Sequence, residues 1–150
     1  ASNPEWNIAC VDRAERLVGR DRNRACVIIW SLGNEAGMGA NHAAMADRIR
    51  RLDSTRPIHY EGDHQALVTD MLSAMYATPA AVRSVGERTG YSLLRTAAAE
   101  QIWQGASVRR ARLDEVPFVL CEYAHCMGSS LGNIDEYLEI KYLCLGDIQK

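Results

Sequence analysis

Two apolar, strand-like runs in this chain each end on a carboxylate. Residues 26–30 (Cys-Val-Ile-Ile-Trp) lead through a Ser-Leu-Gly-Asn segment to Glu35. Residues 116–120 (Val-Pro-Phe-Val-Leu) lead in the same way to Glu122. A charged side chain at the end of a buried strand costs solvation free energy unless the protein uses it. Parallel strands that bring carboxylates to one rim are usual in barrel enzymes, and glycoside hydrolysis needs two such carboxylates. The pattern therefore predicts a sugar-cleaving site, or part of one.

Helical and strand-like segments alternate along the chain. Apolar spacing predicts helices over residues 3–19, 41–52 and 131–138 and within 82–112, and strands over 26–30, 57–61, 71–76 and 117–121. Such alternation implies a parallel sheet with right-handed crossovers. The chain has 150 residues, whereas a complete eight-stranded barrel typically has about 250. We therefore predict an α/β fold that is a partial (β/α)8 TIM barrel, with about four parallel strands and flanking helices.

Composition removes several classes of function. The formal net charge of −2 gives no reason to expect a nucleic-acid partner. No apolar run approaches the roughly 18 residues that span a bilayer, so we expect no membrane partner. The five cysteines are an odd number and lie mostly in apolar stretches, which favours reduced thiols over a disulfide framework. With no signal peptide before Asn3, these features predict a cytoplasmic location.

At this point the motifs resemble a known family. Arg-Asp-Arg-Asn at 20–23, followed by residues 27–35, resembles the acid/base strand of the bacterial β-galactosidases of glycoside hydrolase family 2. Residues 121–128 (Cys-Glu-Tyr-Ala-His-Cys-Met-Gly) resemble the nucleophile strand of that family. The similarity covers about residues 3–137, and the tail 140–150 does not match. The resemblance implies that residues 1–150 form a central part of the family's catalytic barrel domain.

The resemblance also implies roles for five side chains. Glu35 would be the general acid/base and would also ligate magnesium. Glu122 would be the nucleophile, held by the hydroxyl of Tyr76. Asn34 would bind the sugar 2-hydroxyl, and His125 would bind galactose.

Each of these residues also has a plain structural alternative. Glu35 and Glu122 could form ion pairs, and Asn34 could cap a turn. Tyr76 and His125 could be ordinary core residues. Glu61, at the end of the strand predicted over 57–61, is as well explained by an ion pair as by a site role.

The function implied is retaining hydrolysis of terminal β-D-galactosyl residues from β-galactosides such as lactose, within a longer enzyme. The cofactor would be magnesium, with sodium as a second candidate ion, and the site would be incomplete within this chain. The partner would be a small-molecule β-galactoside, and the full-length enzyme would be a homo-oligomer. The alternative is a catalytically inactive barrel fragment that binds sugar or associates with other chains. A β-glucuronidase or β-mannosidase of the same clan is a third possibility, and the motif at 121–128 favours the β-galactosidase.

Overall fold

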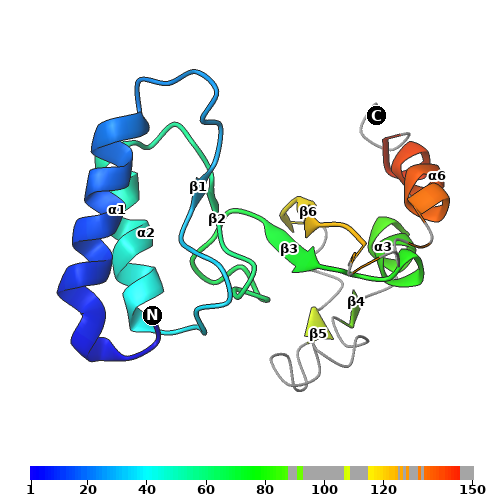
Figure 1. Ribbon diagram of the computed structural model, residues 1–150, viewed down its shortest axis with the longest axis horizontal. Helices are drawn as coiled ribbons and strands as arrows, with labels where there is room; N and C mark the ends of the chain where they lie inside the picture. Colours follow the sequence, from blue (N-terminus) through cyan, green and yellow to red (C-terminus); the bar gives the residue numbers. More distant parts are fainter. Residues whose placement is uncertain are drawn as a thin grey trace. The chain divides into compact units, whose positions relative to one another are not determined.

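The protein is described by a computed structural model in which the chain divides into two compact units (Figure 1). The units comprise Ala1–Ser73 and Ala74–Lys150. The residues that the structure describes are 1–87, 91–92, 107–108, 115–124, 126, 128, 132 and 134–145.

The first unit opens with two helices that pack side by side (Figure 1). The side chain of Asn3 caps the first turn and Pro4 takes its first position, so the chain enters the helix as the sequence predicts. This 3-10 turn, η1 (Pro4–Trp6), continues as α1 (Asn7–Asp21). The second helix, α2, spans Ala40–Leu52 and confirms the helix predicted over 41–52.

Two short parallel strands lie next to these helices. In β1 (Trp30–Ser31) and β2 (Ile58–His59), Trp30 is in register with Ile58 and Ser31 with His59. The Leu32 N–H extends the ladder by donating to the His59 carbonyl at 2.9 Å. Strands and helices share one core, made of Ala14, Val18, Trp30, Leu32, Met45, Ala46, Ile49, Ile58 and Tyr60.

A polar tie fixes the start of β1 to the turn before β2. The Trp30 indole N–H donates to Asp53 Oδ2 at 3.0 Å. The Arg56 guanidinium also hydrogen-bonds Asp53, donates to the Val27 carbonyl at 2.7 Å, and lies 5.4 Å from the Trp30 ring centroid. The tie therefore links the approach to β1 with the chain that enters β2.

The first predicted strand is wrong in length, because only Trp30 of residues 26–30 lies in β1. The Val27 N–H donates to the Arg24 carbonyl in a turn, and Ile28 is 69% exposed. A backbone segment becomes a strand only where another strand satisfies its hydrogen bonds. In the part of the chain that the structure describes, β2 pairs with Trp30 and Ser31 alone.

The second unit is built on β6, β3 and two helices. β3 (Leu72–Met75), which crosses the boundary between the units, pairs with β6 (Phe118–Glu122), and these strands confirm the two predicted over 71–76 and 117–121. Helix α3 (Pro79–Gly86) begins after Thr78, whose hydroxyl accepts a hydrogen bond from the Ala81 N–H. It packs against α6 (Ile134–Leu145) around a core of Val82, Tyr137 and Ile140.

The strand count and pairing differ from the sequence prediction. β4 (Tyr91–Ser92) and β5 (Ser107–Val108) form a local antiparallel pair, which was not predicted, on either side of the helix expected within 82–112. The positions that suggested that helix, 94–102, lie outside the described residues. Within the described ranges there are six short strands in three separate pairs, and they do not join into one parallel sheet of four. The alternation of predicted helices and strands cannot reveal the β4–β5 pair, because two antiparallel strands can be joined without a crossover helix.

The closing helix α6 buries a different face from the one predicted. The helix over 131–138 is predicted from Leu131, Ile134 and Leu138. Tyr137 and Ile140 are buried instead, whereas Ile134 and Leu138 are 38% and 49% exposed, and Leu131 lies outside the described residues. The Tyr137 hydroxyl donates to the Ala77 carbonyl at 2.7 Å, so this aromatic side chain sets which face turns inward. No helix in the described ranges is long and apolar enough to cross a membrane.

Candidate active site

Glu35 lies in the loop that follows β1 and is exposed. Three residues of this loop have left-handed backbone: Gly33 at φ 143°, Glu35 at φ 47° and Gly37 at φ 70°. Glycine adopts these angles without steric penalty, whereas a residue with a Cβ loses on the order of 1 kcal/mol or more. The loop must therefore be held by other contacts at Glu35.

Two adjacent residues just after β2 provide those contacts. The Glu35 N–H donates to Glu61 Oε1 at 2.6 Å. The Ala36 N–H donates to the Tyr60 hydroxyl at 2.9 Å, and that hydroxyl donates to the Gly37 carbonyl at 2.5 Å. Tyr60 and Glu61 thus fix the backbone of three consecutive loop residues; we call these two residues the loop brace.

Tyr60 is fixed by its own surroundings. It is fully buried, and its ring stacks on His42 in the first turn of α2, with centroids 4.4 Å apart and an interplanar angle of 21°. A Cβ at Gly62 would lie 2.4 Å from the Tyr60 ring, so only glycine fits there without displacing the ring. Burial raises the pKa of the Tyr60 hydroxyl, which keeps it protonated and able to donate.

Glu61 is 3% exposed and does not form the ion pair that was weighed for it. Within the described ranges no cation bridges its carboxylate, and its Oε2 atom is buried without a hydrogen-bond partner. Burial raises the pKa of the Glu61 carboxyl, and the charge of Glu35 acts in the same direction. Its Oε1 atom accepts the Glu35 N–H, and the backbone N–H groups of Glu61 itself and of Gly62 also act on the carboxyl and oppose the rise in its pKa.

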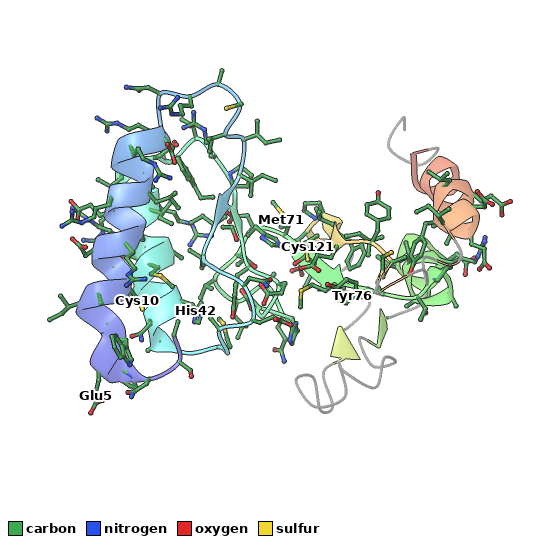
Figure 2. The ribbon with its side chains drawn as sticks, viewed as in Figure 1. Glu5, Cys10, His42, Met71, Tyr76 and Cys121 are labelled. Atoms are coloured by element: carbon green, nitrogen blue, oxygen red, sulfur yellow. The ribbon has the colours of Figure 1, made fainter. Side chains whose placement is uncertain are left out.

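Glu122 is the last residue of β6 and is half-buried in the second unit. The Tyr76 hydroxyl donates a short hydrogen bond to Glu122 Oε2, and the Tyr76 N–H donates to the Glu122 carbonyl at 3.0 Å. Tyr76 directly follows β3 (Figure 2) and has left-handed backbone, with φ 55°. The structure thus brings the predicted nucleophile and the predicted tyrosine together through two hydrogen bonds.

The other predicted site residues are Asn34 and His125. Asn34 is exposed beside Glu35 in the first unit, whereas Glu122 and Tyr76 belong to the second. His125 lies outside the described residues. Within the described residues no three His, Cys, Asp or Glu side chains form a group that could hold a metal ion.

Sequence reasoning missed the loop brace. The sequence predicts Glu61 only as an acid at a strand end with two possible roles, and Tyr60 only as part of the strand over 57–61. A polar pair directly after β2 could have indicated it, because β1 and β2 were both predicted to end at the same rim of the sheet. The contacts themselves depend on the turn geometry after each strand, which apolar periodicity does not report.

Comparison with known proteins places these features in a family. Residues 1–145 match the family model for the glycosyl hydrolases family 2, TIM barrel domain. The chain is similar to proteins named β-galactosidase from Kluyveromyces lactis (42% identical over 142 residues, 95% of this chain and 12% of that protein). It is also similar to those from Arthrobacter sp. (43% over 140 residues, 93% and 13%) and Streptococcus thermophilus (40% over 145 residues, 94% and 14%).

These matches have two consequences. The chain spans only 12% to 14% of the length of these curated relatives. The family model, by contrast, covers nearly all of the chain and includes the Glu35 loop, the loop brace and the Tyr76–Glu122 pair. The chain belongs to the glycosyl hydrolases family 2, TIM barrel domain.

Proposed function

We propose that this chain is part of a longer, retaining glycoside hydrolase that releases terminal β-D-galactosyl residues from β-galactosides such as lactose. Membership of the family supports glycoside hydrolysis, and the names of the relatives support a galactoside as substrate. The observation that carries the proposal is the hydrogen bond from Tyr76 to the carboxylate of Glu122 at the end of β6. A carboxylate held in this way is oriented for nucleophilic attack.

In the first step, a Glu122 carboxylate oxygen attacks the anomeric carbon as the bond from that carbon to the leaving oxygen breaks. Glu35 gives its proton to the leaving oxygen, so the aglycone departs as an alcohol. The sugar is then held as an ester on Glu122. Asn34 and His125 would bind sugar hydroxyls, and contacts that strengthen in the transition state speed this step.

In the second step, Glu35 takes a proton from water, and the water oxygen attacks the anomeric carbon. The ester bond to Glu122 breaks, its carboxylate is restored, and galactose leaves with its original anomeric configuration. A retaining mechanism needs the two carboxyl groups about 5–5.5 Å apart. We expect this spacing between Glu35 and Glu122 in a complete barrel.

The site offers the type of ligand that magnesium prefers, but the described residues offer too few such ligands. Carboxylate oxygens suit Mg²⁺, and the exposed Glu35 would supply one. The described residues contribute no group of three candidate ligands. Magnesium, with sodium as a second candidate ion, would need further ligands, and no step of the mechanism above is assigned to either ion. A homo-oligomeric, cytoplasmic enzyme remains the expectation from the sequence.

The test is the substitution Glu122→Gln in a complete polypeptide that carries this chain. It removes the covalent route, so turnover of an aryl β-galactoside should fall by several orders of magnitude. Aryl β-glucuronides and β-mannosides, assayed with the unsubstituted polypeptide, test the other activities of the clan. Near-normal galactosidase turnover by the variant would assign the nucleophile elsewhere, and preference for another glycoside would overturn the substrate.

Glu35→Gln separates the acid/base role from the nucleophile. An aryl leaving group needs little protonation, so the first step should continue while attack by water becomes slow. Azide, a small anion that needs no general base, should then restore turnover and give a galactosyl azide. Glu122→Gln is the matched control. It forms no ester, so any azide product would arise by direct attack on the substrate and carry the inverted α configuration, whereas Glu35→Gln should give the β-galactosyl azide.

A further inference from the structure

Glu61 is a buried carboxylate for which the mechanism above has no use. A buried acid is normally paired with a cation, because an isolated charge is costly to desolvate. Within the described ranges Glu61 has no such partner, and its Oε1 atom accepts from the N–H of Glu35 at 2.6 Å. The backbone N–H groups of Glu61 itself and of Gly62 are local partners. The hydrogen bond from Glu35 is therefore the contact that links this acid to the loop after β1.

The contact acts on a strained residue. Glu35 has φ 47°, a conformation that a residue with a Cβ adopts only when its surroundings determine it. Without the Glu61 acceptor, the Glu35 N–H would lose its partner and the loop could relax toward ordinary backbone angles. Such a change would turn the Glu35 side chain away from its present direction, because the Cα–Cβ bond follows the backbone.

Tyr60 strengthens the same restraint from the neighbouring position. Its hydroxyl accepts from Ala36 and donates to Gly37, on either side of a single peptide unit. Stacking on His42 and the absence of a side chain at Gly62 keep the Tyr60 ring in place. The loop brace thus holds the Glu35 backbone at its own N–H and at the two residues after it.

We propose that Glu61 is a positioning residue that aims the acid/base carboxylate of Glu35, by accepting the Glu35 N–H and so fixing its left-handed backbone. This inference rests on the proposed function. It assigns Glu61 no contact with sugar and no proton transfer. What matters is an acceptor oxygen at Oε1, and Tyr60 is the second member of the restraint.

The test compares two variants in a complete polypeptide that carries this chain. Glu61→Gln keeps a carbonyl oxygen that can accept the Glu35 N–H, whereas Glu61→Met keeps the length of the side chain and removes that oxygen. Each is assayed on lactose, whose leaving group needs protonation, and on 2,4-dinitrophenyl β-galactoside, whose leaving group does not. Misplacement of a catalytic group by about 1 Å can cost about 100-fold.

We expect Glu61→Met to lower kcat/KM for lactose by about 100-fold. Its kcat/KM for the dinitrophenyl substrate should change by less than about 3-fold, while its kcat should fall and be restored by azide. Glu61→Gln should remain near the unsubstituted enzyme on both substrates. Tyr60→Phe removes the hydroxyl of the loop brace. It should also lower kcat/KM for lactose, by a smaller factor than Glu61→Met.

Ile49→Val is the control for a merely structural effect, since it loosens the core that contains Tyr60 and leaves both residues of the loop brace in place. This variant should lower kcat/KM for both substrates by the same small factor, and azide should not change its kcat. If Glu61→Met behaves like this control, or if Glu61→Gln is as impaired as Glu61→Met, the positioning role is overturned. Failure of the proposed function has a separate signature, which is galactosidase activity that survives Glu122→Gln.

Discussion

Left-handed backbone marks two of the predicted catalytic positions. Among the described residues, the non-glycine residues with positive φ are Glu35, Ala66 and Tyr76. Strain of this kind persists where the surrounding structure over-determines it, and it gathers at functional sites. Glu35 is restrained by Glu61, and Tyr76 by its two hydrogen bonds to Glu122. The strain therefore supports the proposed roles independently of sequence similarity.

Tyr76→Phe should lower turnover and leave the fold in place. The variant keeps the ring and the backbone bond to Glu122 and loses the hydroxyl that donates to the carboxylate. A freed nucleophile is less well oriented, so we expect kcat for an aryl β-galactoside to fall about 10–100-fold. Steady-state kinetics on a complete polypeptide measures the effect. Tyr123→Phe, at an exposed tyrosine next to Glu122, is the matched control and should stay within about 2-fold.

One buried and two partly buried histidines should make the first unit sensitive to acid. Burial lowers the pKa of His42 and His59, and it lowers the pKa of His64 to about 4. In the unfolded chain a histidine has a pKa of about 6.5. Between these values the unfolded state binds a proton that the folded state does not, so stability falls as the pH drops from about 6.5 to about 4.

His64→Gln should reduce this loss of stability. Glutamine does not titrate, so the variant's urea midpoint should fall less than that of the unsubstituted chain between pH 7 and pH 5. His42 and His59 still contribute, so part of the loss should remain. Equal losses in both chains would mean that His64 is not neutral in the folded state.

At the scale of elements, the tie of Trp30, Asp53 and Arg56 connects β1 to the turn before β2. The Asp53 side chain is 6% exposed. Hydrogen bonds from Thr55, Arg56 and Trp30 hold the pKa of its carboxyl well below the usual range. Removing one partner of such a network leaves buried charge and donors without partners.

Asp53→Ala should therefore open the β1–β2 pair. We expect a loss of about 3 kcal/mol in local stability, measured as faster amide hydrogen exchange at Trp30 and Leu32, whose N–H groups donate to the chain of β2. Asp47→Ala is the control, since Asp47 pairs with Arg51 on the exposed surface of α2. An exposed pair contributes about 0–1 kcal/mol, so exchange at these amides should hardly change.

The sequence predicted elements best where local chemistry determines them. Helix α2 follows from the spacing of Met45, Ile49 and Leu52, and the start of η1 follows from Asn3 and Pro4. The first strand was overestimated because its length depends on a partner strand. The face of α6 was misjudged because Tyr137 finds a distant acceptor in Ala77, which no local pattern encodes.

The same distinction applies to the candidate site. Glu35, in the loop after β1, and Glu122, at the end of β6, could both be located from apolar runs followed by acids. The left-handed backbone angles at Glu35 and Tyr76 could not be predicted from the sequence, because tertiary hydrogen bonds impose them against local preference. Glu61 shows the same limit, since its acceptor role depends on how two loops meet.

At the scale of the whole molecule, the 150-residue chain alone should be a poor enzyme and a poor monomer. Large apolar side chains are exposed, among them Ile28 at 69% and Leu67 at 72%, and short strands offer unpaired edges. We expect light scattering to show self-association, with hydrolysis of an aryl β-galactoside near background. A monodisperse monomer with turnover that disappears in Glu122→Gln would contradict this.

Gly62 gives the brace a consequence for directed evolution. A methyl group at this position would collide with the buried Tyr60 ring, and that ring is coupled through Ala36 and Gly37 to the loop of Glu35. Libraries that aim to broaden substrate range usually randomise sugar-facing positions and treat distant glycines as neutral. Here a change at Gly62 should silence the enzyme without altering any residue that touches the sugar, so screens should hold this glycine constant.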